Sequence, residues 1–250
     1  MPKGARGINA VSISQDGSLV ACVDLANEHN VYVFDVASGS MVCKAAGDTE
    51  KIFDIAFSAT NGDGSFATAG SKHFYFWDAS QPGGGKKKAL FDGLEATSFS
   101  CVAWDADGKA YGGGANAKIY IFDKAERKCV GTIDAHKDGF ICALTYVDGK
   151  LFSGGKDGQV CCIDTASMQV TKTWDFNNLV RAIDFKDGNL LVGLRNGSIM
   201  ECAGAGSPRE IMHSHFDGEV WGLDVSQYPS IYTSCDDNQV CCWDASNRKI

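Results

Sequence analysis

The chain contains little proline and lacks long hydrophobic runs. Only 4 of its 250 residues are proline, against 29 glycines, which excludes collagen-like and proline-rich disordered classes. No apolar run approaches the roughly 18 residues that a membrane-spanning helix needs. The opening segment 1–6 has no apolar stretch like that of a signal peptide. We therefore expect a globular chain with no secretory leader and no membrane partner.

An excess of positive charge is also missing. The sequence has 23 Lys and Arg residues against 31 Asp and Glu residues, a formal net charge of −8. Proteins that bind nucleic acids generally need a basic face for the phosphate backbone. The acidic balance therefore excludes general nucleic-acid affinity.

Cysteine is abundant, but it lacks the patterns of a disulfide framework or a zinc site. The 11 cysteines are odd in number, and no Cys-x-x-Cys pair occurs among them. Two adjacent pairs, Cys161-Cys162 and Cys241-Cys242, would point to opposite faces of a strand. We expect reduced thiols that act as small apolar residues, in a cytosolic or nuclear protein.

A short apolar and aromatic run, usually ending in Asp, recurs six times. The starts of the copies, Val31, Phe74, Ile119, Val160, Ile199 and Val240, are separated by 43, 45, 41, 39 and 41 residues. This spacing is the period of a four-stranded propeller blade. No stretch shows a sustained helical period.

The rest of each repeat supports the same interpretation. An alternating strand lies upstream of every run, and an Asp-Gly turn typical of hairpins usually follows that strand. A small-residue strand then leads into the run, and a shorter fourth strand follows, as at 171–174. The sequence predicts an all-β WD40 propeller over 7–250 after a short segment 1–6, with units near 7–48, 49–92, 97–135, 136–175, 178–213 and 215–250.

The last unit carries a more specific pattern. His215, Thr233, Asp237 and Trp243 are spaced by 18, 4 and 6 residues, as in the buried hydrogen-bonded tetrad of WD40 repeats. An Asp can accept from the imidazole, the hydroxyl can bridge, and the indole N–H is then satisfied.

The fourth unit contains a partial tetrad. It has His136, Ser153 and Asp157 at spacings of 17 and 4, with Ile163 in place of the Trp.

Three features resemble chemical sites, and each has a simpler structural explanation. His136, Ser153 and Asp157 contain the residue types of a hydrolase triad, but a Gly-x-Ser-x-Gly elbow is absent and the spacing fits the tetrad. The segment 82–88, Pro-Gly-Gly-Gly-Lys-Lys-Lys, lacks phosphate-loop spacing and is interpreted as a loop whose lysines could attract an acidic partner. The histidines are too scattered for a metal cluster. We expect no catalytic, cofactor or metal site.

Binding surfaces remain as the functional candidates. In a propeller the first strand of each blade lines the channel, so residues at its entry and in the turns between the second and third strands are the usual contacts. Phe53, Arg181 and Trp221 occupy equivalent entries, and aromatic residues and Arg are favoured interface anchors. The alternative for Phe53 and Trp221 is packing between blades.

Three basic residues occupy the turns between the second and third strands. They are Lys72, Lys156 and Arg195. The alternative to a binding role is that these cations are simply solvated.

Several segments resemble one WD40 family more closely than the general consensus. They run in order from about residue 6 to about residue 246 and include 6–11, 27–31, 70–77, 135–144, 153–157, 215–223 and 233–240. In these segments the chain resembles part of the first propeller of the echinoderm microtubule-associated protein-like (EMAP-like, EML) family.

This resemblance implies a non-enzymatic interaction module of the microtubule cytoskeleton. Its partners would be tubulin, microtubules or microtubule-associated proteins, and its location cytoplasmic and cytoskeletal, including cilia and axonemes. The alternative is a general WD40 scaffold in a ubiquitin-ligase or trafficking complex without tubulin contact. No oligomeric state is implied.

Ring closure is an open question at this level. Propellers avoid exposed sheet edges by closing the ring, but the sixth unit reaches Ile250 just after its third strand. Residues 1–6 could supply an edge strand, the ring could stay open, or the chain could be part of a seven-bladed unit. We favour an incomplete propeller.

Overall fold

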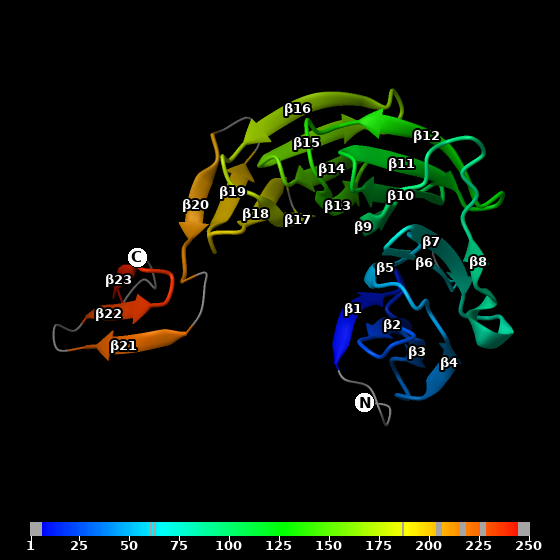
Figure 1. Ribbon diagram of the computed structural model, residues 1–250, viewed down its shortest axis with the longest axis horizontal. Helices are drawn as coiled ribbons and strands as arrows, with labels where there is room; N and C mark the ends of the chain where they lie inside the picture. The colour runs from blue at the N-terminus through cyan, green and yellow to red at the C-terminus, as the bar shows by residue number, and fades with distance from the viewer. Residues whose placement is uncertain are drawn as a thin grey trace.

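The chain folds into antiparallel β-sheets arranged in an arc around a central channel (Figure 1). The computed structural model describes residues 7–60, 62, 64–186, 188–203, 207–215, 219–225 and 229–244. Within them lie five four-stranded sheets and one three-stranded sheet. The prediction of an all-β WD40 propeller is confirmed, whereas segment 1–6 and the end of the sixth unit lie outside the described residues.

The strands follow the chain order within each of the first three sheets. Their bounds are β1 (Ile8–Ile13), β2 (Leu19–Asp24), β3 (Val31–Asp35) and β4 (Met41–Ala45); β5 (Ile52–Phe57), β6 (Ser65–Gly70), β7 (His73–Asp78) and β8 (Lys87–Lys88); β9 (Phe99–Trp104), β10 (Lys109–Gly114), β11 (Lys118–Asp123) and β12 (Lys128–Asp134).

The remaining sheets repeat this order. Their bounds are β13 (Ile141–Val147), β14 (Lys150–Gly155), β15 (Gln159–Asp164) and β16 (Gln169–Asp175); β17 (Val180–Lys186), β18 (Asn189–Leu194), β19 (Ile199–Ala203) and β20 (Arg209–Met212); β21 (Val220–Asp224), β22 (Ser230–Cys235) and β23 (Val240–Asp244).

Local sequence explains the hairpins but not the length of the fourth strands. Gly108 and Gly149 adopt φ of +83° and +77° in the turns after β9 and β13, where an L side chain would be strained. The expectation of a shorter fourth strand is wrong for the third and fourth sheets, because β12 and β16 each have 7 residues. These outer strands pair with β11 and β15 along their whole length, with one register shift in each pair.

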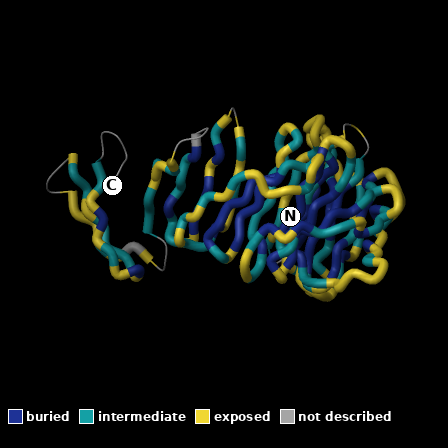
Figure 2. Tube along the Cα trace, turned by 90° about the horizontal axis from the view of Figure 1, so that it is seen from above, coloured by how far each residue is buried: buried dark blue, intermediate teal, exposed yellow. Residues whose placement is uncertain are grey.

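The core consists of layers between neighbouring sheets. Ile119 and Ile121 of β11 pack against the fourth sheet, whereas Tyr120 and Phe122, on the other face, pack against the second. Phe122 stacks on Phe74 with ring centroids 4.3 Å apart. Each sheet thus depends on its neighbours to bury both faces, and the buried positions are concentrated in the first four sheets (Figure 2).

Several cysteines contribute to these layers. All 11 are thiols that take no part in a disulfide bond. Cys161 packs in the layer between the third and fourth sheets, and Cys162 packs in the layer between the fourth and fifth. The predicted opposite orientation of adjacent cysteines therefore places both in the core, because this sheet is covered on both sides.

Hydrogen bonds tie the inner strands of neighbouring sheets together. The Asn9 side chain donates to the Ile52 carbonyl at 2.5 Å, and Ser12 accepts from the Phe57 amide at 3.1 Å. Further along the arc, the Asp54 carboxylate accepts from the Val102 amide at 2.9 Å. These side chains satisfy backbone groups that no strand neighbour reaches, and they fix how one sheet meets the next.

The sixth sheet contains a four-residue hydrogen-bonded chain. Asp237 lies 2.8 Å from His215 Nδ1, Thr233 Oγ1 lies 2.8 Å from His215 Nε2, and the Trp243 indole donates to Thr233 at 2.7 Å. If Asp237 accepts from Nδ1–H, the threonine hydroxyl donates to Nε2 and accepts from the indole, so every partner is satisfied. The chain connects the segment before β21 to β22 and β23.

The fourth sheet contains a shorter version of the same chain. His136 Nδ1 lies 2.9 Å from Asp157, and His136 Nε2 lies 2.9 Å from Ser153 Oγ. The serine is fully buried, as is the imidazole. Ile163, where a full tetrad has Trp, is also fully buried and has no polar group to satisfy.

Other sheets use different buried pairs. The Trp77 indole donates to Thr68 at 2.9 Å in the second sheet. The Tyr32 hydroxyl donates to Asp24 at 3.0 Å in the first, and the Tyr111 hydroxyl donates to Asp105 at 2.9 Å in the third. In each of these three sheets a buried polar side chain is satisfied by a hydrogen bond to another side chain, but the residues that form the bond differ.

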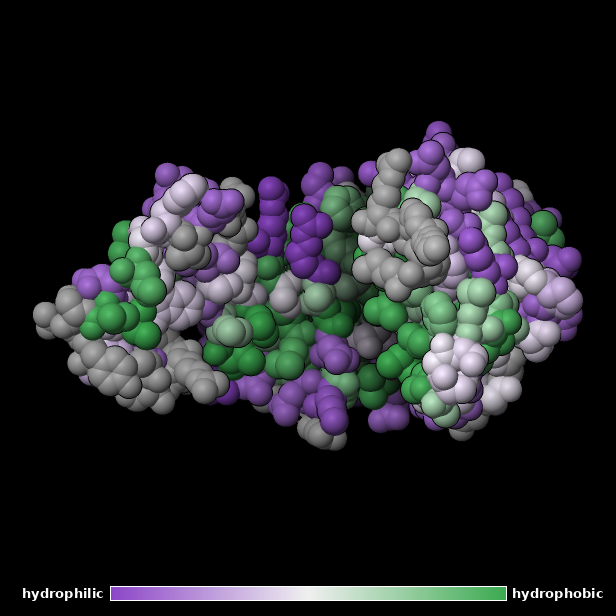
Figure 3. All heavy atoms as spheres, turned by 90° about the horizontal axis from the view of Figure 1, so that it is seen from below, coloured by the Kyte–Doolittle hydropathy of each residue, from purple (hydrophilic) through white to green (hydrophobic). Residues whose placement is uncertain are grey.

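The ring is open between the first and sixth sheets (Figure 1). On the first sheet Val11 and Ile13 are both 63% exposed, and on the sixth Trp221 and Leu223 are both 72% exposed. Hydrophobic side chains gather along the hollow side of the arc in the view of Figure 3. Among the described residues, no core cluster joins the fifth and sixth sheets.

The part of the chain that the structure describes contains no helix with the length and apolar character needed to cross a membrane.

We expect Ser153→Ala to lower the free energy of unfolding by about 1–2 kcal/mol, because a buried imidazole nitrogen loses its partner. Chemical denaturation of the whole chain measures this. Ser167→Ala is the matched control, since its hydroxyl makes an exposed hydrogen bond to Asp164 at 2.7 Å. The control should change stability by less than about 0.5 kcal/mol, and an equal effect of the two substitutions would contradict the role of burial.

Asp54 should make stability depend on pH. Burial raises the pKa of Asp54 to about 6, despite hydrogen bonds from Val102 and Ile55 that lower it. The unfolded side chain has a pKa of about 3.9, so the folded state binds more protons between these values and loses stability as the pH rises through them. Asp54→Asn should remove this loss while it keeps an acceptor for the Val102 amide.

The test compares unfolding free energies of Asp54→Asn and the unmodified chain from pH 4 to pH 7. The advantage of the variant should grow with pH to about 2–3 kcal/mol. Other carboxylates titrate in both proteins and cancel in this difference. A difference that stays constant over this range would refute the assignment.

Candidate interaction surface at the channel mouth

The second residue of every inner strand is the extra residue of a β-bulge. In β1, β5, β9, β13, β17 and β21 the pairing register shifts around this position. The six bulge residues are Asn9, Phe53, Ser100, Cys142, Arg181 and Trp221. A bulge leaves its extra residue outside the ladder and re-aims the side chain, so these positions form a series along the channel mouth.

Two of the six bulge residues serve the fold. Asn9 donates to the Ile52 carbonyl at 2.5 Å, and Ser100 donates to the Ile141 carbonyl. Both bonds reach the residue just before the bulge of the next sheet. Phe53, Cys142 and Arg181 make no such link among the described residues, which leaves them available for contacts outside the chain.

Four of the bulge residues line one pocket. Its volume is about 470 Å³, and Phe53, Ser100, Phe140, Cys142 and Arg181 are among the residues that surround it. These come from four neighbouring sheets, so no single blade contains the site. Phe53 is 41% exposed, and the Arg181 guanidinium has no hydrogen-bond or ion-pair partner within the described part of the chain.

The chemistry of this pocket favours binding over catalysis. Burial raises the pKa of the Cys142 thiol to about 11, against a smaller opposite effect of Arg181. The thiol is therefore neutral near pH 7 and a poor nucleophile. Three phenylalanines, Phe53, Phe99 and Phe140, and one unpaired cation fit a partner that offers an apolar group beside a carboxylate.

The predicted basic turns lie beside this mouth, with one difference in register. The backbone amides of Lys156 and Arg195 donate to Phe140 and Leu179 at 3.0 and 2.8 Å. In the second sheet Ser71, not Lys72, makes the equivalent bond. Lys72 lies one residue further on, at φ +60°, and its amide donates to Ser98 Oγ. All three basic side chains are exposed.

Trp221 is separate from the pocket. It lies on the sixth sheet, and its indole donates to Asp236 at 2.7 Å. Its exposure does not fit packing between blades within the described residues. The structure therefore brings Phe53 and Arg181 together and leaves Trp221 apart.

Sequence reasoning missed the contribution of Phe140, Ser100 and Cys142. A signal was present, because each of the four bulge residues in the pocket follows a buried apolar residue at the strand entry: Ile52, Phe99, Ile141 and Val180 are all fully buried. Aligning the repeats on this residue would have selected Ser100 and Cys142 with Phe53 and Arg181.

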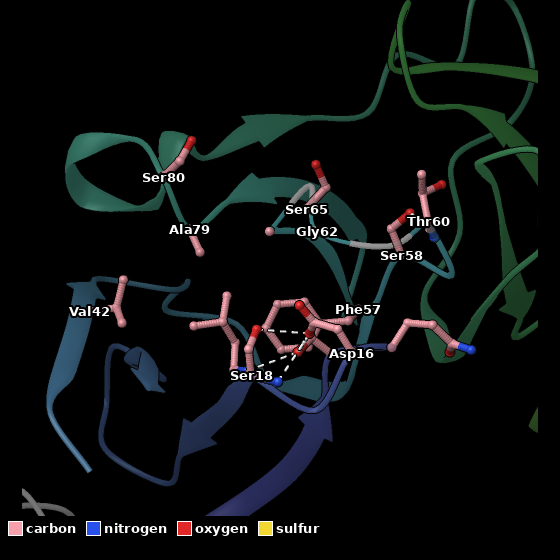
Figure 4. A pocket seen from close by; sticks show the side chains of 14 residues that line it. Asp16, Ser18, Val42, Phe57, Ser58, Thr60, Gly62, Ser65, Ala79 and Ser80 are labelled. Atoms are coloured by element: carbon pink, nitrogen blue, oxygen red, sulfur yellow. Dashed lines mark hydrogen bonds between the residues drawn. The ribbon is translucent and has the colours of Figure 1, made fainter. Parts of the chain in front are cut away.

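A second pocket lies between the first and second sheets, where their first turns meet (Figure 4). Asp16 accepts from the hydroxyls of Ser14 and Ser18 at 2.6 and 2.8 Å. These bonds, with the Ser14 hydroxyl contributing most, lower the pKa of Asp16 to about 2. A carboxylate so committed to its own turn is a weak base, and it offers no acid–base chemistry near neutral pH.

The residues that could act in catalysis or bind a metal ion already take part in hydrogen bonds within the fold. Ser153 is fully buried, so a substrate could not reach its hydroxyl. His215, Cys235 and Asp237 offer ligand atoms within 4.8 Å of one another. Both nitrogens of His215, however, already contact Asp237 and Thr233. A metal ion would have to break this hydrogen-bonded chain.

Comparison with known proteins agrees with the fold and its repeats. The family model for the echinoderm microtubule-associated protein first beta-propeller matches residues 2–202, and that for the WD domain, G-beta repeat, matches residues 206–244. The boundary between the two matches falls between β19 and β20 of the fifth sheet.

Similar proteins come from ciliates, mammals and sea urchins. The ciliary WD repeat-containing protein ctxp80 of Euplotoides octocarinatus is 42% identical over the whole chain and 35% of its own length. The human echinoderm microtubule-associated protein-like 1 is 26% identical over 96% of the chain and 30% of its own length. The 77 kDa echinoderm microtubule-associated protein of Lytechinus variegatus is 25% identical over 91% of the chain and 35% of its own length.

The chain thus spans about a third of the length of these relatives. The first family match covers most of the chain, including the first four sheets and three strands of the fifth. The chain belongs to the echinoderm microtubule-associated protein family of WD40 propellers.

Proposed function

We propose that this chain is a non-enzymatic interaction module that binds tubulin, microtubules or a microtubule-associated protein through its channel mouth. Membership of the echinoderm microtubule-associated protein family supports this role. The names of the relatives, a ciliary WD repeat protein and microtubule-associated proteins, support a location in the cytoskeleton or the cilium.

The observation that carries the proposal is the pocket formed by four bulge residues and Phe140. It combines exposed aromatic surface with an unpaired Arg181, and aromatic and Arg side chains dominate interface energetics. Lys156 and Arg195 flank the mouth. In a chain of net charge −8, such local cations allow an acidic partner to approach.

The non-enzymatic part of the proposal rests on the state of the reactive groups. Ser153 is buried in a hydrogen-bonded chain, Cys142 carries a raised pKa, and Asp16 is committed to its own turn. The Ser14 hydroxyl and the Asp16 carboxylate do meet in the pocket of Figure 4, but the lowered pKa makes Asp16 too weak a base to activate a serine.

Co-sedimentation of the whole chain with microtubules, and gel filtration with unpolymerised tubulin, test this function. We expect binding to at least one of them, and a loss of affinity of about tenfold or more in Phe53→Ala/Arg181→Ala, because an aromatic anchor and a charge-assisted contact are removed. Repeating both assays with microtubule-associated proteins bound to the lattice separates direct from indirect attachment.

Leu191→Ala/Lys186→Ala is the matched control. It removes an apolar side chain of similar exposure, 40%, and a cation from the fifth sheet. The control should bind like the unmodified chain. Absence of binding in every assay, or an equal loss in both double variants, would reject the proposed surface.

A further inference from the structure

A third pocket, with basic walls, lies where β7 and β8 of the second sheet face the turn between β11 and β12 of the third. Its volume is about 440 Å³, and Phe76, Trp77, Pro82, Lys87, Lys124 and Arg127 are among the residues that line it. It shares no residue with the channel-mouth pocket. Three of the chain's 23 basic residues therefore converge on one hollow of an acidic protein.

Of the lysines 86–88, Lys87 is the one that lines this pocket. Lys86 Nζ lies 4.2 Å from the centroid of the Tyr75 ring and donates to the Gly47 carbonyl, so it is used within the fold. Lys87 follows in β8, pairs with Phe76, and is exposed. Lys88 is the other residue of β8 and points to the opposite face, so Lys87 is the lysine of segment 82–88 that faces the hollow.

The opposite wall is held in place by the backbone. Arg127 and Lys124 lie in the turn between β11 and β12, where Arg127 adopts φ +56°. The Arg127 carbonyl accepts from the Leu90 amide at 2.8 Å, and the Leu90 carbonyl accepts from the Cys129 amide at 2.7 Å. Two backbone bonds thus join the segment after β8 to the turn that carries Arg127, and the pocket is preformed.

Two of the cations in this pocket, Lys87 and Arg127, are not balanced by an acidic lining residue. Asp78 is the acidic residue among those that line it, and its carboxylate accepts from the Ser80 amide and hydroxyl at 2.9 and 2.6 Å. These bonds outweigh burial and hold the pKa of Asp78 below its usual value, with Lys124 adding a smaller effect. Within the described residues, neither Lys87 nor Arg127 has an ion-pair partner.

We propose that this outer pocket binds an acidic peptide segment of a partner protein, with its carboxylates on Lys87 and Arg127. Phe76, which pairs with Lys87 and lies on the same face of the sheet, and Pro82 offer apolar surface to the methylene groups of glutamate side chains. The guanidinium suits a bidentate carboxylate, and the ammonium adds a point charge. This site acts independently of the channel mouth.

The charge distribution favours a peptide over a nucleic acid. A nucleic acid presents a continuous row of phosphates, and tight binding neutralises many of them along an extended basic surface. Here the cations form one compact group on a chain of net charge −8. A short carboxylate segment can contact this group without lying over the acidic remainder.

Fluorescence anisotropy of a labelled ten-glutamate peptide with the whole chain tests the proposal. We expect saturable binding that weakens as salt is added, and a loss of affinity of about tenfold or more in Lys87→Glu/Arg127→Glu. Lys87→Gln/Arg127→Gln should also weaken binding, and it checks that charge reversal did not act through misfolding. A labelled ten-glutamine peptide should not bind.

Lys150→Glu/Lys186→Glu is the charge-matched control, since both lysines are exposed and lie on other sheets. It makes the same change in net charge and should retain peptide binding. Equal losses in the two Glu variants, no loss in either pocket variant, or tighter binding of single-stranded DNA or phosphatidylserine vesicles than of the peptide would overturn the proposal. Each of these outcomes leaves the microtubule assays of the channel-mouth variants unaffected.

Discussion

Face-to-face packing of neighbouring sheets is the constraint on which this structure depends. A four-stranded sheet has two faces, and one repeat cannot bury them alone. The third strand of each blade meets this demand with apolar side chains on both sides, as β11 does by sending Ile121 toward one neighbour and Phe122 toward the other. The need to pack both faces explains the apolar and aromatic run that recurs in the sequence. Where a neighbour is absent among the described residues, as beside β21, the same residue types are exposed.

This constraint also decides where binding residues can lie. Core positions cannot change their chemistry without loss of packing. Side chains whose chemistry differs from one repeat to the next must therefore lie at positions outside the hydrogen-bonded ladder. In β5, β9, β13 and β17 the bulge provides such a position one residue after a fully buried anchor, such as Ile52 before Phe53 or Val180 before Arg181. At Asn9 and Ser100 the released side chain returns to the fold and ties neighbouring sheets together. The channel mouth therefore contains both bulge residues that bond to the neighbouring sheet and bulge residues that can contact a partner.

Much of the fold could be predicted from the sequence, because each strand is marked by residues close to it. The repeat period, the Asp-Gly turns and the spacings of His215 and His136 to their partners all lie within one unit of about 40 residues. The channel-mouth pocket could be predicted only in part. Phe53 and Arg181 were visible as repeat positions, but their convergence with Phe140 depends on contacts between sheets that local patterns do not encode. Likewise the three lysines of 86–88 look alike in the sequence, and only pairing with β7 separates them.

The channel-mouth pocket and the outer pocket differ in the interaction that each can supply. At the channel mouth, aromatic surface surrounds one unpaired guanidinium, so burial of an apolar group supplies most of the energy and Arg181 contributes mainly selectivity. At the outer pocket, Phe76 is largely buried, Lys87 is exposed and Arg127 is partly exposed, so charge dominates and added salt weakens the contact. A partner with an apolar anchor on one segment and acidic residues on another could engage both sites of one chain. Linkage of this kind raises the overall affinity above that of either pocket, because the second contact becomes intramolecular.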